Sequence, residues 1–363
     1  MSNSLFEKTT LGNLELSNRI VMAPMTRSRA IGNIPNDLMA EYYRQRAAAG
    51  LIITEGTAPS ANGLGYARIP GAYTTDQVAG WKKVTSAVHD KGGKIFLQIM
   101  HTGRVSHAAN MAAGTEIVAP SAIGLVNGEM WTDTEGMQPY PTPRALETSE
   151  IPALIQEYVH AAKSAIEADF DGVELHGANG YLIEQFINTA SNKREDQYGG
   201  SVENRIRFAV EVSKAVAEAI GADKTGIRLS PYGVFNEMAI YSAMDETYLA
   251  LTKALNDLNL VYIHLVDHSA MGAPTVSQDL VVQIREAFDN ALILSGGYDE
   301  TRAQADLDAD KGDLIAFGRP FLANPDLVAR LQTGAELNQP NMDTFYTPGA
   351  EGYTDYPVLE SVG

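Results

Sequence analysis

The residues whose types and spacing most clearly permit chemistry are an imidazole, an amide and a phenol within six positions: His176, Asn179 and Tyr181. They directly follow the apolar run 172–175, which is typical of a buried strand. In a β/α barrel, polar groups at the carboxyl end of a strand lie where such barrels keep their active sites. We therefore identify this segment as a candidate site. The same side chains can in principle ligate a metal ion, but no second carboxylate lies close by in the sequence.

A second candidate site lies at two glycine-rich strand ends near the C-terminus. Gly296 and Gly297 follow one apolar run, and Gly318 and Arg319 follow the next. Glycines let backbone N–H groups approach an anion closely, and the loops after the last two strands are the usual phosphate site of β/α barrels. Arg319 would add a fork of donors for phosphate oxygens. The pattern favours a phosphate site, and its alternative is a tight turn with an ordinary ion pair.

The chain contains eight short apolar runs, each followed by a segment with helical periodicity. The runs are 19–23, 51–54, 94–99, 173–175, 226–229, 262–266, 291–294 and 314–317. Ser277 is a candidate N-cap for one of the helices. Eight alternating units favour a closed parallel barrel over an open sheet, and no G-x-G-x-x-G fingerprint opens a helix.

One stretch departs from this alternation. The segment from about His101 to Thr148 is rich in Gly, Pro, Ser and Thr and is too long for a plain loop. We therefore predict an α/β fold: a single (β/α)8 TIM barrel with an insertion between strands 3 and 4 that caps the barrel mouth.

The composition excludes several classes of protein. The 363-residue chain has no cysteine, which excludes disulfides, thiolate catalysis and Cys-ligated metal sites. Its formal net charge of −18 repels the phosphate backbone of nucleic acids. Residues 1–5 do not resemble a signal peptide, and no window approaches the roughly 18 apolar residues of a membrane span. We expect a soluble, cytoplasmic protein without nucleic-acid or membrane partners, as either a monomer or a dimer.

Longer motifs extend these observations along the chain. They are Asn18–Arg27, Gln98 through Arg104, His176–Tyr181, Asn192–Arg205, Arg228–Pro231, Gly318–Phe321 and Gly352–Pro357. In this order, the chain resembles the Old Yellow Enzyme family of FMN-dependent ene-reductases along essentially its whole length. The resemblance implies a single FMN-binding oxidoreductase domain over residues 1–363.

The resemblance implies a non-covalent FMN across the barrel mouth. The residues expected to hold it follow barrel strands: Pro24, Met25, Thr26, Ala58, Gln98, Arg228, Gly296, Gly297, Gly318 and Arg319. By this resemblance the Thr26 hydroxyl donates to the flavin carbonyl next to N5, and Gln98 binds the pyrimidine portion. Arg228 stabilises the negative charge of the reduced flavin. The alternative for Arg228 is a buried ion pair with an acidic residue.

The resemblance also implies the reaction. NAD(P)H reduces the flavin and leaves, and an activated alkene then takes its place in a ping-pong sequence. The expected substrates are α,β-unsaturated carbonyls, maleimides and nitroalkenes. His176 and Asn179 resemble a donor pair for the carbonyl or nitro oxygen. Tyr181 resembles the acid that protonates the carbon next to the activating group, so that hydrogen adds trans.

Four further residues match positions that line the substrate pocket of the family: Tyr66, Met100, Phe235 and Tyr346. Met100 stands where relatives often place tryptophan, and its flexible thioether predicts tolerance of bulkier alkenes. The chain carries His-Asn where many bacterial relatives carry His-His. Both pairs can donate, so we expect activity with a different substrate preference.

Other functions stay open at the level of sequence. The same scaffold can reduce nitrate esters or nitroaromatics, and a non-redox barrel enzyme or a flavin-storage protein are further alternatives. His264, Asp267 and His268 superficially resemble a metal cluster, but neither their spacing nor a third ligand is compelling, so we predict no metal. Four acidic residues are expected in surface or inter-loop ion pairs: Glu184, Glu195, Asp196 and Glu203.

Overall fold

Eight parallel strands form the centre of the molecule in the computed structural model, which describes residues 4–359. They close into a barrel in chain order: β3 Ile20–Met22, β4 Leu51–Ile53, β5 Ile95–Ile99, β10 Gly172–Gly177, β11 Thr225–Leu229, β12 Tyr262–Val266, β13 Ala291–Ser295 and β14 Leu314–Phe317. Each apolar run of the sequence is one of these strands. Nearly every strand residue is buried, because side chains fill the barrel and helices cover it. The predicted TIM barrel is confirmed.

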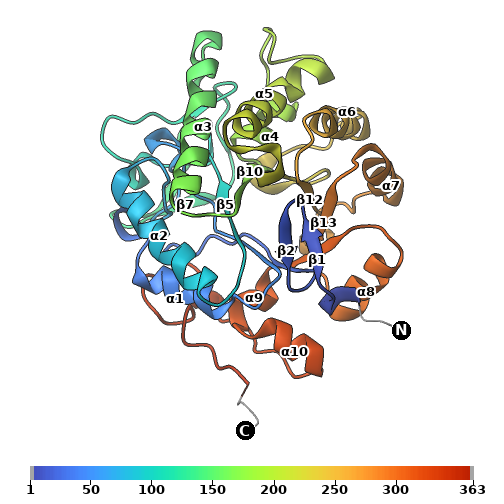
Figure 1. The fold of residues 1–363 in the computed structure, drawn as a ribbon. Coiled ribbons are helices and arrows are strands. Elements are labelled where there is room, and N and C mark those ends of the chain that lie inside the picture. Colours follow the sequence, from blue (N-terminus) through green and yellow to red (C-terminus); the bar gives the residue numbers. More distant parts are fainter. Residues whose placement is uncertain (1–3, 360–363) are drawn as a thin grey trace.

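Helices surround the barrel in chain order, from blue through red in Figure 1. They are α1 Asp37–Gln45, α2 Thr75–His89, α3 Ile151–Glu167, α4 Leu182–Ile187, α5 Val202–Ile220, α6 Met244–Asp257, α7 Gln278–Ala287, α8 Glu300–Asp308, α9 Arg319–Ala323 and α10 Leu327–Thr333. In α3, for example, Leu154, Tyr158 and Ala162 recur at four-residue spacing and are buried together. Within residues 4–359, no helix is both long enough and apolar enough to cross a membrane.

Polar side chains fix where several helices begin. The N-cap side chains that accept a backbone N–H are Asn36, Thr74, Ser201, Ser277 and Asp299. Ser277 Oγ accepts the N–H of Leu280 at 3.1 Å, which confirms the predicted cap. At Thr74, the backbone N–H donates in return to Gln77 Oε1, which completes a capping box. These caps fix the residue at which each helix begins and therefore the residue at which the preceding loop ends.

A hairpin that the sequence analysis did not predict covers the amino-terminal end of the barrel. Its strands, β1 Thr9–Leu11 and β2 Leu14–Leu16, pair antiparallel and lie in front of the barrel in Figure 1. Leu11 and Leu16 are buried in the same apolar cluster as the barrel residue Phe96. The hairpin thereby closes part of this end, and a cleft lined by residues that include Thr9, Arg19 and Asp313 remains beside it.

The segment between β5 and β10 folds into short strands above the carboxyl end of the barrel. Strand β6 (Val118–Ala119) pairs with β9 (Arg144–Ala145), and β7 (Glu129–Thr132) forms a hairpin with β8 (Gly136–Pro139). Side chains of this hairpin border the same cleft as Tyr181, which follows β10. The predicted insertion over the barrel mouth is confirmed.

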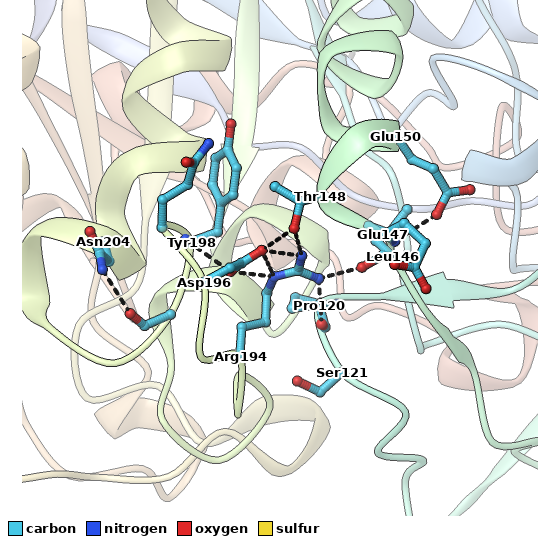
Figure 2. A network of polar contacts seen from close by, with 12 residues as sticks. Pro120, Ser121, Leu146, Glu147, Thr148, Glu150, Arg194, Asp196, Tyr198 and Asn204 are labelled. Carbon is cyan, nitrogen blue, oxygen red and sulfur yellow. Dashed lines mark hydrogen bonds and ion pairs between the residues drawn. The ribbon is translucent and has the colours of Figure 1, made fainter.

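Arg194 ties this insertion to the loop after α4, as Figure 2 shows. Its guanidinium donates to the carbonyl oxygens of Pro120, at 3.0 Å, and Leu146. Asp196 pairs with Arg194 at 2.5 Å and accepts a hydrogen bond from Thr148 Oγ1. The hydrogen bonds from Arg194 are the main cause that lowers the pKa of Asp196 to about 2. The ion pair predicted for Asp196 is therefore present, but it lies within one loop, and the hydrogen bonds around it are what join the two loops.

Replacing Arg194 with Met should loosen the insertion, because it removes the donors to two carbonyl groups and leaves Asp196 unpaired. We expect the free energy of unfolding to fall by about 2 kcal/mol. We also expect faster proteolytic cleavage within residues 101–148. Urea unfolding and limited proteolysis measure the two effects.

The matched control is Lys214→Met, which removes an exposed pair with Glu218 (3.8 Å) on α5. This control should change the free energy of unfolding by less than about 0.5 kcal/mol. Equal stability and equal cleavage of the two variants would show that Arg194 does not anchor the insertion.

Candidate active site

Two neighbouring clefts open at the carboxyl ends of the barrel strands. One, the glycine cleft, is bordered by the ends of β3, β11, β12, β13 and β14, and its lining includes Pro24, Met25, Arg228, His268, Gly296, Gly297, Gly318 and Arg319. The other, the tyrosine cleft, lies under the insertion, and its lining includes Thr26, Tyr66, Trp131, Tyr140, Tyr181 and Tyr346. Most of the predicted site residues therefore gather at one end of the barrel.

His176 is placed by the barrel itself. It lies at the end of β10, and the parallel register pairs it with Arg228 on β11. Its Nδ1 accepts the N–H of Ala178 at 3.4 Å, so the ring proton is on Nε2. Burial, reinforced by the charge of Arg228, lowers the pKa of His176 well below its usual value. The residue is thus a neutral N–H donor.

Tyr181 stands directly before α4, with its ring edge-on to that of His176 at a centroid distance of 4.8 Å. Its hydroxyl lies 2.9 Å from the hydroxyl of Tyr66. Burial raises the pKa of Tyr181 to about 12, against the opposing effect of the Tyr66 hydrogen bond. The phenol therefore keeps its proton at any ordinary pH.

Asn179 has a left-handed backbone conformation, with φ of 59°. Asparagine tolerates this conformation better than most residues. Its backbone N–H donates to Ser230 Oγ at 2.9 Å, and its carbonyl accepts from Asn236 Nδ2 at 2.7 Å. Its side-chain Oδ1 lies 2.7 Å from Nε2 of His268. Neighbouring loops thus fix the backbone of Asn179 by two hydrogen bonds and its side-chain oxygen by a third.

Glu184 holds the loop between His176 and α4, and the prediction that it forms a surface or inter-loop ion pair is wrong. Its side chain is buried and accepts hydrogen bonds from Gly180 N at 2.6 Å, Ser230 Oγ at 2.9 Å and Tyr248 Oη at 2.8 Å. Burial raises its pKa to about 7. The missed signal is a single carboxylate within the otherwise uncharged stretch 182–187.

Arg228 is buried in the barrel mouth and forms no ion pair with residues 4–359, and its Nε has no hydrogen-bond partner there. The alternative of a buried ion pair is therefore wrong. The nearby carboxylate of Glu174 instead accepts from Gln98 Nε2 at 2.8 Å. Burial lowers the pKa of Arg228, and the charge of Glu174 opposes this effect. A buried guanidinium without a partner fits an anionic ligand.

Below Arg228, Glu174 is the centre of a polar layer that crosses the barrel. Besides Gln98, it bonds Tyr262 Oη at 3.1 Å and His264 Nδ1 at 2.8 Å. The Tyr262 ring reaches Glu174 by lying over Gly226, where an added Cβ would come within 2.3 Å of it. His264 is therefore a hydrogen-bonding partner within this layer. Residues 4–359 hold no group of three or more His, Asp or Glu that could bind a metal ion.

The glycine cleft can hold an anion because its loops carry little side-chain bulk. Gly296 has φ of 128°, and a Cβ added there would lie 2.1 Å from the carbonyl oxygen of Asp267, so only glycine fits. Arg319 is exposed at the edge of the same cleft. Together with the unpaired Arg228, this donor set fits the phosphate and the reduced ring of FMN.

Six predicted residues lie apart from the lining of the two clefts: His176, Asn179, Ala58, Gln98, Met100 and Phe235. Ala58, Gln98 and Met100 are buried, and Met100 packs beneath Tyr66 and Tyr181. Phe235 is 39% exposed, and its ring lies 4.7 Å from that of His268. Their roles toward cofactor and substrate stay predictions. His268 and Glu184, which sequence reasoning did not assign to the site, are built into it.

Known proteins resemble this chain over its full length. A family model described as NADH:flavin oxidoreductase / NADH oxidase matches residues 4–338. A probable flavin mononucleotide-dependent alkene reductase of Leishmania infantum is 43% identical over 354 residues, covering 96% of each chain. 12-Oxophytodienoate reductase 1 of Oryza sativa subsp. japonica is 44% identical over 362 residues, covering 97% of this chain and 92% of its own.

Solved structures agree with these matches. Morphinone reductase superposes with a TM-score of 0.96 at 45% identity, over 100% of this chain and 99% of its own. An old yellow enzyme homologue from Zymomonas mobilis gives a TM-score of 0.94 at 42% identity, over 98% and 100%. The chain belongs to the NADH:flavin oxidoreductase / NADH oxidase family, which confirms its resemblance to the Old Yellow Enzymes and the predicted use of FMN and NAD(P)H.

Proposed function

We propose that this protein is an ene-reductase that reduces the activated C=C bond of α,β-unsaturated carbonyl compounds, maleimides or nitroalkenes. The observation that carries the proposal is the group of neutral donors at one strand end: a neutral imidazole (His176), an amide (Asn179) and a protonated phenol (Tyr181). They lie beside the unpaired Arg228. This arrangement suits a substrate that develops negative charge on an oxygen and then takes up a proton.

The cofactor site follows from the same geometry. The glycine cleft, with Gly296, Gly297 and Arg319, would bind the FMN phosphate, and Arg228 would pair with the anionic ring edge. Gln98 donates through Nε2 to Glu174, so its Oε1 is free to accept from the pyrimidine N–H. FMN, when bound, supplies the hydride equivalent, drawn from NAD(P)H, that the β-carbon of the alkene requires.

The protein side chains supply the remaining steps. His176 Nε2 and the Asn179 amide donate to the carbonyl or nitro oxygen, and both are neutral, so they stabilise the developing charge without protonating it. Tyr181 then gives its proton to the α-carbon, and the hydroxyl of Tyr66 remains to stabilise the phenolate. The alkene gains two hydrogens, NAD(P)H is oxidised, and the Tyr181 phenolate recovers its proton from solvent.

Replacing Tyr181 with Phe should slow the alkene half-reaction by roughly two to four orders of magnitude, the usual contribution of a general acid. Flavin reduction by NADPH should be nearly unchanged. Anaerobic stopped-flow spectroscopy measures the two half-reactions separately. Bleaching of the yellow flavin by NADPH reports flavin reduction, and return of the colour on adding 2-cyclohexenone reports alkene reduction. Tyr66→Phe keeps the acid and is the control, with an expected loss of less than about tenfold. Equal slowing of both half-reactions in Tyr181→Phe would refute the acid role.

The rate of the alkene half-reaction should be flat between about pH 8 and pH 10, a range that lies above the pKa of about 7 of Glu184, which holds the loop, and below the pKa of Tyr181. Tyr181 loses its acid form only as the pH rises toward its raised pKa of about 12. His176 acquires charge only when the pH falls below its strongly lowered pKa. Stopped-flow rates of the alkene half-reaction, measured across this pH range, test the prediction. A rate that halves by about pH 9 would mean that another group is the acid.

Replacing Arg228 with Met should move two measurements in opposite directions. FMN binding should weaken by about 10- to 100-fold, because a charge-assisted contact is lost. The FMN-free protein should become more stable by about 1–3 kcal/mol, because a buried unpaired charge is removed. Fluorescence titration of the apoprotein and urea unfolding measure the two effects.

The control for Arg228 is Arg44→Met, which breaks an exposed pair with Glu41 (2.7 Å) and should change neither measurement appreciably. Loss of stability in the FMN-free Arg228→Met protein would show that Arg228 has a structural partner after all.

A further inference from the structure

We propose that His268 is a positioning residue that holds the Asn179 amide with its NH2 group toward the substrate oxygen. The inference rests on the proposed function, because it assigns Asn179 the donor role. It concerns a residue that contributes to substrate recognition only through another side chain.

The contact between the two residues is short and enclosed. His268 Nε2 lies 2.7 Å from Asn179 Oδ1, and the imidazole is 4% exposed. The backbone carbonyl of His268 accepts from Met271 N at 2.8 Å, and its ring meets that of Phe235 edge-on at 4.7 Å. The ring therefore has little freedom to turn away from the amide.

The hydrogen-bond pattern of Asn179 leaves one group for a ligand. Within residues 4–359, its backbone N–H, its backbone carbonyl and its Oδ1 have partners. The amide NH2 remains. A side-chain amide has a donor end and an acceptor end, so fixing the oxygen on His268 directs the donor end away from it.

The opposite orientation of the amide is unfavourable on both sides. It would turn the amide NH2 toward His268 and require His268 Nδ1 to carry the ring proton, and that buried atom has no partner among residues 4–359. It would also point the amide oxygen at the oxygen of the substrate. Burial and the charge of Arg228 lower the pKa of His268 to about 4, so the neutral ring with its proton on Nε2 is the relevant form.

His176 shows why the amide needs such a neighbour. The Nδ1 of His176 accepts the N–H of Ala178, two residues along the same loop, which fixes the proton on Nε2 locally. Among residues 4–359, no group close to Asn179 in the sequence bonds its side-chain amide and distinguishes its two ends. The distinction comes from His268, 89 residues further along the chain.

A double-mutant cycle tests the inference on the FMN-loaded protein. The variants are His268→Leu, Asn179→Ala and the combination of both, with His268→Gln as the rescue variant, since a glutamine amide can still donate to Oδ1. The readout is the dissociation constant of 2-cyclohexenone for the oxidised protein, followed by flavin absorbance. FMN content and melting temperature show whether each variant is folded.

We expect His268→Leu to weaken cyclohexenone binding by about 3- to 10-fold, the scale of one hydrogen bond, and His268→Gln to recover most of it. In the Asn179→Ala background, His268→Leu should have no further effect. A full effect in that background, or a loss in His268→Gln equal to that in His268→Leu, would overturn the inference. Binding needs no turnover, so wild-type protein that binds cyclohexenone without reducing it would refute the proposed function separately.

Discussion

The unpaired guanidinium of Arg228 is the constraint on which the rest of the site depends. A charge in a barrel interior is costly unless something compensates it, and the nearest carboxylate, Glu174, is already held by Gln98, Tyr262 and His264. The protein therefore keeps a positive charge for a ligand rather than for its own stability. Residues at functional sites often trade stability in this way. In the proposed site, an anionic cofactor is the partner that makes the arrangement favourable, so we expect cofactor binding to stabilise the fold.

The same charge adds to the effect of burial on the neighbouring histidines. His176 and His268 both lie near Arg228, and in both, burial and this charge lower the pKa. The two imidazoles are therefore neutral donors rather than acids. Burial acts on Tyr181 in the opposite sense and keeps its phenol protonated. In the proposed mechanism, the imidazole and the amide therefore stabilise negative charge, and the phenol alone transfers a proton.

The barrel could be predicted because its signals are local. Each of the eight apolar runs lies within a few residues of the polar groups that follow it. The register of neighbouring strands then brings His176 beside Arg228. The supporting residues could not be predicted in this way. Glu184 bonds Ser230, 46 residues away, and His268 bonds Asn179, 89 residues away. The hairpin β1–β2 was missed because its three-residue strands are too short to show a period of two.

Strands and loops contribute differently to this site. His176, Arg228 and Glu174 lie on barrel strands, where hydrogen-bonded register fixes their spacing and therefore the charge beneath the cofactor. Asn179, Tyr181 and His268 lie on loops, which depend on side-chain bonds for their positions. In the proposed mechanism, changes in a loop can therefore alter which substrate oxygen is bound and where the proton is delivered, while the strands keep the electrostatics of the flavin unchanged. Substrate preference can vary on this scaffold without loss of the redox chemistry, because the two depend on different elements.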